Sequence, residues 1–92
     1  MGFDLMEVYE SGRPFVVVGS SCNACESFKK DVINANDDSV IYFNVDDLNK
    51  NEIAFISSLK IIQIPTAVKK VNGSGVTLKI KSYEEYKSWA AC

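Results

Sequence analysis

Two cysteines, Cys22 and Cys25, stand three positions apart between an apolar run and a segment with the periodicity of a helix. The start of a helix carries unpaired backbone N–H groups and the positive end of the helix dipole, and both stabilise a thiolate. A cysteine placed there has a lowered pKa and attacks disulfides. A second cysteine one helical turn later is close enough to resolve the mixed disulfide that forms. We therefore predict that Cys22 and Cys25 are a redox-active pair, with the pKa of Cys22 below that of a free thiol.

The content of cysteine and histidine narrows the chemistry that this chain can perform. Three cysteines with one close pair make a poor disulfide framework, and the lack of histidine excludes Cys-His catalysis and His-containing metal sites. A zinc site would need Cys22, Cys25, Cys92 and a carboxylate, without a second paired motif. We therefore expect no metal and no other cofactor. Cys92 is interpreted as a terminal thiol without a role, with a regulatory thiol as the alternative.

Charge and hydropathy exclude several classes of partner. The net charge of −2 is too small to indicate binding to nucleic acid or to an anionic membrane. No apolar run approaches the ~20 residues that span a bilayer, and the N-terminus has no pattern of a secretory signal. We expect a cytoplasmic protein that works as a monomer.

The spacing of apolar residues predicts one domain, residues 1–92, with eight elements. The run 15–19 is apolar throughout, as in a strand buried on both faces by helices. A helix separates it from the next strand, so these two strands should be parallel. The segment 72–75 predicts a four-residue hairpin loop because it contains Asn-Gly. In chain order, the prediction is helix 3–11, strand 15–19, helix 23–35, strand 40–45, helix 49–60, strand 67–71, strand 76–81 and a final helix from residue 83.

Each predicted helix has an apolar face that should contact the sheet. In the final helix, Ser82 should be the N-cap, with the side chain of Glu85 reaching back to it in a capping box. The expected inner positions are Ala24, Phe28, Val32 and Ala35 in the first long helix, Ile53, Ile56 and Leu59 in the second, and Tyr83, Tyr86, Trp89 and Ala90 in the last.

Together, Cys22-Asn23-Ala24-Cys25 after a buried strand, Ile64-Pro65-Thr66 further along, and a hairpin followed by a terminal helix resemble the thioredoxin superfamily. The resemblance spans residues 15–89 and is to a short, thioredoxin- or glutaredoxin-type member. It implies an α/β, thioredoxin-like fold, in which a four-stranded mixed sheet, with two parallel strands and an antiparallel hairpin, lies between about four helices.

The same resemblance implies roles for several residues. Cys22 would be the exposed attacking thiol and Cys25 the buried resolving thiol. Pro65 would be a cis-proline beside them, an isomer that costs proline only ~0.5–1 kcal/mol. The backbone of Ile64 would pair with the bound substrate. From the sequence alone, Pro65 can also be read as an ordinary trans-proline at the start of a strand.

The chain departs from thioredoxin around the pair. Ser21 stands in place of a tryptophan, and Asn23-Ala24 stands in place of Gly-Pro, so we expect these three residues to shape a different substrate site. Val16 replaces a buried aspartate that accepts the proton of the resolving thiol. Lys81-Ser82 stands in place of the glycine-containing loop before the last helix. The substrate groove should therefore be smaller and more polar.

These observations predict a thiol-disulfide oxidoreductase with a reversible Cys22–Cys25 disulfide. It would reduce disulfides of protein substrates, with a reductase or glutathione as electron donor. The alternative from another class is a non-catalytic thioredoxin-fold interaction module, whose dithiol is structural or gates binding by its redox state. A third reading, that the two cysteines are ordinary small core residues, also stays open.

Overall fold

The strand that precedes the two cysteines is the central element of the fold. In this computed structural model, which describes residues 4–91, β1 (Phe15–Val18) is buried at every position. It lies between a parallel neighbour, β2 (Tyr42–Asn44), and an antiparallel neighbour, β3 (Thr66–Val71). The strand β4 (Ser74–Lys79) pairs with β3 and completes a mixed sheet of order β2-β1-β3-β4. The predicted parallel pair and antiparallel hairpin are confirmed.

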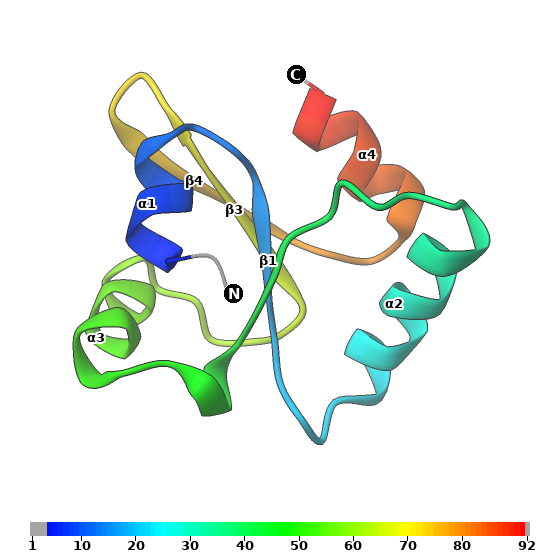
Figure 1. Ribbon diagram of the computed structural model, residues 1–92, viewed down its shortest axis with the longest axis horizontal. Helices are drawn as coiled ribbons and strands as arrows, with labels where there is room; N and C mark the ends of the chain where they lie inside the picture. The colour runs from blue at the N-terminus through cyan, green and yellow to red at the C-terminus, as the bar shows by residue number, and fades with distance from the viewer. Residues whose placement is uncertain (1–3, 92) are drawn as a thin grey trace.

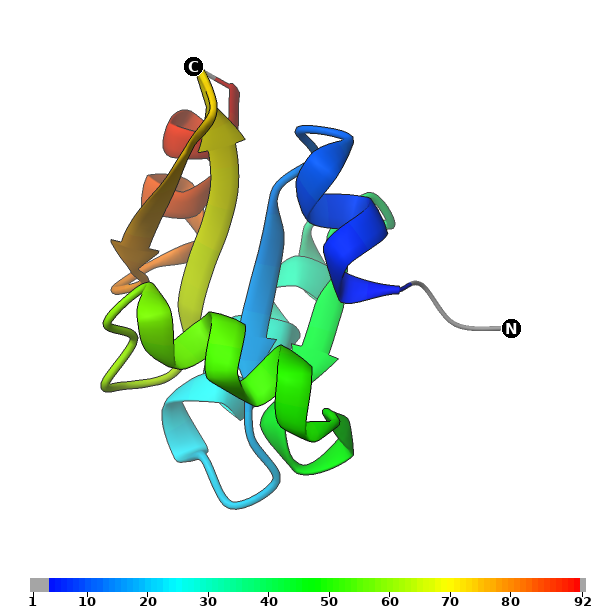
Figure 2. The same cartoon turned by 90° about the vertical axis from the view of Figure 1, so that its left-hand side faces the viewer.

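Four α-helices in the described part of the chain cover both faces of this sheet. Their bounds are α1, Leu5–Glu10; α2, Asn23–Asn34; α3, Lys50–Ser58; and α4, Tyr83–Ala91, with a 3-10 helix η1 at Val45–Asp47. Figure 1 shows α1 and α3 on one side of β1, and α2 and α4 on the other. Figure 2, the view rotated by 90°, shows α3 crossing in front of the strands. The chain is therefore a mixed α/β domain with three layers.

Alternate side chains of β1 enter two separate hydrophobic cores. Phe15 and Val17 point into the core below α1 and α3, which we call the first core. Val16 and Val18 point into the core below α2 and α4, the second core. Because successive residues of a strand face opposite sides, a strand that is apolar throughout is explained by helices on both faces.

The hairpin between β3 and β4 is tighter than predicted. Asn72 and Gly73 alone form the turn, both with positive φ (52° and 83°), while Ser74 pairs with Val71 and Gly75 with Lys70. The prediction of a four-residue loop is therefore wrong. A two-residue turn that suits the twist of the strands needs positive φ at both positions, and Asn-Gly provides it. Ser74 and Gly75 consequently extend the edge strand.

The helices α2 and α3 expose some residues that were predicted to face the sheet. In α2, Cys25, Phe28 and Val32 are buried, whereas Ala24 is exposed, as is Ala35 at the C-cap. One face of a helix holds only about two positions per turn. In α2 the larger side chains of Phe28 and Val32 occupy the face that contacts the sheet.

In α3, Ile53 is 38% exposed, so its prediction as an inner residue is wrong. Phe55 instead packs against the first core, and its ring meets Tyr9 edge to face with centroids 4.8 Å apart. At about 100° per residue, burial of Phe55 rotates Ile53 away from the sheet. Ile56 and Leu59 contact the core as predicted.

The start of α4 confirms one half of the predicted cap. The Glu85 N–H donates to Ser82 Oγ over 3.1 Å, but the Glu85 carboxylate accepts from the Lys81 N–H, 3.2 Å away, and not from Ser82. Of the predicted inner residues of this helix, Tyr86 is buried, while Tyr83, Trp89 and Ala90 pack partly buried against the second core. Cys92 lies outside the described residues. No helix within residues 4–91 combines the length and apolarity needed to cross a membrane.

Candidate active site

The two cysteines lie at the connection between β1 and α2 and in the first turn of α2. Cys22 is the N-cap of α2, with extended backbone, and its Sγ accepts a hydrogen bond from the Cys25 N–H over 3.0 Å. The pair forms a disulfide, with Sγ atoms 2.24 Å apart and Cα atoms 5.2 Å apart. A sulfur in this position replaces the hydroxyl of the usual Ser or Thr cap and receives a backbone donor of the first turn.

The two sulfurs differ in their access to solvent. Cys22 is half-buried, whereas Cys25 is fully buried, at 0% exposure, among the apolar side chains of the second core. A substrate sulfur can therefore approach Cys22 but not Cys25. The arrangement also places the positive end of the α2 dipole at the accessible sulfur, where it stabilises negative charge.

The loop before β3 forms the opposite wall of the site. The Ile64–Pro65 peptide bond is cis, as predicted, and Pro65 is buried. The carbonyl oxygen of Ile64 lies 3.8 Å from Cys22 Sγ. Cys22 and Ile64, to which the resemblance assigned roles at one site, therefore lie next to each other. No backbone N–H of the described residues is bonded to this carbonyl, because β3 begins only at Thr66.

Gly19 permits this close approach between segments far apart in the sequence. A Cβ atom at Gly19 would lie 2.5 Å from Cδ1 of Ile64, which is closer than the van der Waals contact distance of two non-bonded carbon atoms. The Ile64 side chain thus packs directly over the backbone that leads from β1 to Cys22. Because Gly19, just after β1, has no side chain, the loop before β3 can lie close to the dithiol.

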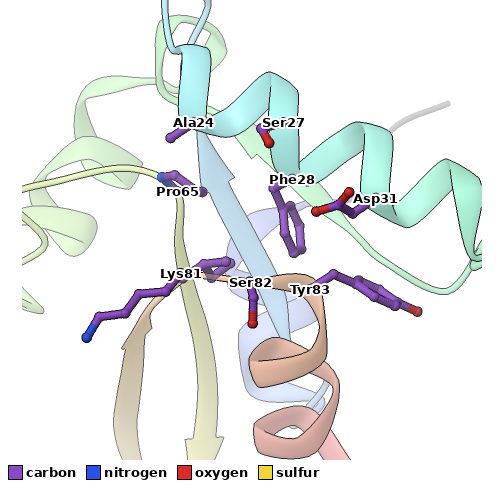
Figure 3. Close-up of a pocket in the computed structure, with 9 residues that line it drawn as sticks. Ala24, Ser27, Phe28, Asp31, Pro65, Lys81, Ser82 and Tyr83 are labelled. Carbon is purple, nitrogen blue, oxygen red and sulfur yellow. The ribbon is translucent and has the colours of Figure 1, made fainter.

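A groove of about 110 Å³ begins beside the dithiol and lies between α2 and the start of α4. Figure 3 shows its walls: Ala24 and Pro65 together at one end, Phe28 further along α2, and Ser82 and Tyr83 on the opposite side. Of the predicted substrate-site residues, Ala24 and Pro65 line this groove. Ser21 and Asn23 are exposed beside Cys22 and do not line it, and Ile64 contacts the sulfur instead.

Several residues that line the groove were not predicted from the sequence as site residues, among them Ser27, Asp31, Ile80 and Lys81. Ser27 and Asp31 continue the face of α2 that begins with Ala24, at spacings of three and four. A search for polar residues at helical spacing from the second position of the motif would have found them. Lys81 and Ile80 reach the groove only because β4 and α4 pack beside α2.

The surroundings of Cys25 hold no proton acceptor with a carboxylate. Among residues 4–91 the polar residues buried as a whole, backbone included, are Thr66 and Lys69, and Val16, where a thioredoxin has an aspartate, is an apolar member of the second core. In the same range no cluster of His, Cys, Asp or Glu side chains could hold a metal ion.

A polar network secures the end of the groove away from the dithiol. Asp37, whose side chain is 8% exposed, accepts hydrogen bonds from Ser39 and from the Tyr83 hydroxyl over 2.6 Å, and pairs with Lys87 at 3.0 Å. The hydrogen bonds from Ser39 and Tyr83 hold the pKa of Asp37 well below its ordinary value. The hydrogen bond to Asp37 raises the pKa of Tyr83 to about 12. Together they tie α4 to the loop after α2.

The chain matches no protein-family model, and no curated protein sequence matches it significantly.

Proposed function

We propose that this protein has a thioredoxin-like fold and works as a thiol-disulfide oxidoreductase that reduces disulfides of protein substrates. The observation that carries the proposal is the position of Cys22. Its accessible sulfur caps α2 directly above the buried Cys25, and it faces the Ile64 carbonyl across the site.

The reaction begins from the reduced pair. The Cys22 thiolate attacks one sulfur of the substrate disulfide, a mixed disulfide forms, and the other substrate sulfur leaves as a thiolate that takes up a proton. Cys25 then loses its proton and attacks Cys22 Sγ, which releases the second substrate thiolate. The substrate gains two electrons and the protein ends with the Cys22–Cys25 disulfide seen here. A cellular reductase or glutathione would supply two electrons to restore the dithiol.

The local structure favours the thiolate of Cys22 at the first step. Once the disulfide is reduced, the N–H of Cys25 and the start of α2 remain directed at Cys22 Sγ. Both stabilise the charged form, so the pKa of Cys22 in the reduced protein should lie below the ~8.5 of a free thiol. At neutral pH a larger fraction of Cys22 is then the nucleophile.

The unpaired backbone of Ile64 supports a way to hold a peptide substrate. Its carbonyl points to the dithiol without a backbone donor among the described residues. An extended substrate segment can supply an N–H there, as a strand does when it adds to a sheet edge. This contact would place the substrate disulfide at Cys22. We further propose that the protein acts as a monomer in the cytoplasm, where the reducing environment would maintain the dithiol.

A reduction assay with insulin as the disulfide substrate and dithiothreitol as the electron donor tests the proposal. We expect the wild-type protein to accelerate insulin reduction and Cys22→Ser to give only the background rate. Cys25→Ser should keep Cys22 reactive but unable to release its product, so mass spectrometry should find a stable mixed disulfide. Equal rates with and without the wild-type protein, or no adduct on Cys25→Ser, would contradict the proposal.

One observation favours the second candidate function, a non-catalytic module with a redox-gated dithiol. The carboxylate that would accept the Cys25 proton is missing, with Val16 in its place. Without it, the second step of the reaction could be too slow for turnover. A protein that cycles between dithiol and disulfide with dithiothreitol, but does not accelerate insulin reduction, would be such a module.

A further inference from the structure

The groove beside the dithiol continues along α2 into a second hollow. The two hollows share Asp31, Ser82 and Tyr83, and the second adds Asn34, Ala35 and Glu84. Their common residues make one channel, which we call the α2–α4 groove. It starts at Ala24, between the cysteines, and ends beside Asn34 and Glu84. Whatever binds at Cys22 can therefore extend along it.

The walls of the α2–α4 groove carry unpaired negative charge. The Asp31 carboxylate points toward the Phe28 ring inside the groove (Figure 3), and it has no hydrogen bond or ion pair with any residue of the described range. Glu84 adds a second carboxylate at the far end. Both carboxylates are exposed, so a positively charged group of a ligand can pair with them.

The cations near the groove do not neutralise Asp31. Lys87 is engaged by Asp37 at 3.0 Å, and the Lys81 amine extends away from Asp31 in Figure 3. The hydroxyls of Ser27 and Ser82 lie along the same gap; Ser82 Oγ accepts from the Glu85 N–H. The groove thus presents carboxylate and hydroxyl oxygens, which are acceptors for a cationic group.

We infer that the α2–α4 groove binds an arginine side chain of the protein substrate, about three residues from its reactive cysteine. This inference rests on the proposed function. Ala24 and Asp31 are seven residues apart on α2, which corresponds to about 10 Å along the helix axis. An extended peptide covers that distance in about three residues. The planar guanidinium can bind the Asp31 carboxylate with two hydrogen bonds while its stem packs over Phe28 and the ring of Tyr83.

Peptide disulfides that differ at one position test this inference. Three peptides would carry Arg, Gln or Glu three residues from a cysteine that is disulfide-bonded to a small neutral thiol. We expect wild-type kcat/KM to be about threefold to tenfold higher for Arg than for Gln, and lowest for Glu. Asp31→Asn should remove this preference, and Asp31→Glu should retain most of it.

Asp46→Asn is the matched control. It makes the same charge change at the same edge of the sheet, because Asp46 follows β2, which runs parallel to β1, but it lies outside the groove. The preference for Arg should survive in this variant. Loss of the preference in both variants would indicate a general effect of net charge and would overturn the inference.

The outcomes separate this inference from the proposed function. If wild-type protein reduces all three peptides at equal rates, the inference fails and the oxidoreductase stands. If no disulfide is reduced, the proposed function fails, and an NMR titration with a cysteine-free Arg peptide decides about the groove. Shifts of the Ser27, Asp31 and Ser82 amides that disappear in Asp31→Asn would support it; no shifts would overturn it.

Discussion

The two faces of the sheet are built from the same strands but have different compositions. The first core, below α1 and α3, contains the aliphatic and aromatic side chains of Phe15, Val17 and their neighbours. The second core, below α2 and α4, contains Cys25 and is bordered by polar contacts. Among them, Lys69 donates to the carbonyl of Trp89 and lies under its ring, 4.5 Å from the centroid.

This difference indicates a division of tasks between the faces. Burial on the first face is mainly apolar and stabilises β1, with Lys70 lying over the Tyr9 ring only at its margin. On the second face, α2 must present Cys22 at one end while α4 forms the other wall of the groove. Directional contacts such as that of Tyr83 with Asp37 fix these two helices relative to each other. The following predictions would break or sharpen this distinction.

The largest effect is expected from truncation of one aromatic residue on each face. Phe15→Ala and Phe28→Ala remove rings that are 0% and 3% exposed, so each should lower the free energy of unfolding by about 3–5 kcal/mol. Only Phe28→Ala should also slow disulfide reduction in the folded protein, because Phe28 supports α2 and the groove. Urea unfolding and insulin reduction measure both quantities, with the Phe→Leu variants as a milder pair. An equal loss of activity in folded Phe15→Ala would refute the division of tasks.

A smaller and pH-dependent effect is expected from Asp37→Asn. Hydrogen bonds from Ser39 and Tyr83 lower the pKa of Asp37 in the folded state, so its stabilisation is present above the unfolded pKa of about 3.9 and is lost as pH falls further. At pH 7 the variant should lose about 1–2 kcal/mol of unfolding free energy. This difference from wild type should shrink at pH 3. Urea unfolding at pH 7, 5 and 3 would show this, and a difference that is constant with pH would argue against it.

At high pH the second face should again be the sensitive one. The hydrogen bond to Asp37 raises the pKa of Tyr83, and burial raises that of Tyr86, in both cases to about 12. A raised folded-state pKa adds stability that is complete below the unfolded value of about 10 and is lost as pH rises toward 12. Absorbance of tyrosinate, followed together with circular dichroism, should show late ionisation that coincides with unfolding. Ionisation of every tyrosine near pH 10 in a folded protein would contradict this.

The smallest effect is expected from an ion pair at the margin of the first face. Lys70 donates to the Glu10 carboxylate, but Glu10 is exposed and the pair is open to solvent. Exposed pairs of this kind contribute little because water and salt screen them. Glu10→Gln should therefore leave the midpoint of urea unfolding unchanged within error. A loss as large as that of Asp37→Asn would show that the faces do not differ in their use of charge.

The sequence by itself determined the dithiol and the framework that carries it. The valine-rich run, the helical spacing after Cys25 and the Asn-Gly turn are local patterns, so they predict elements without knowledge of their neighbours. The placement of Cys22 at the start of α2 followed from the same patterns. The cis isomer of Pro65 was expected from the resemblance, and the structure has it.

Only the tertiary structure decided which helix faces are buried and what surrounds the dithiol. Ile53 is exposed because Phe55 in the same helix packs against the ring of Tyr9, a residue far away in the sequence. The contact of Tyr83 with Asp37 spans 46 positions. Likewise, the α2–α4 groove exists because the chain brings α4 beside α2. Such contacts depend on which segments meet in space, and no local spacing encodes that.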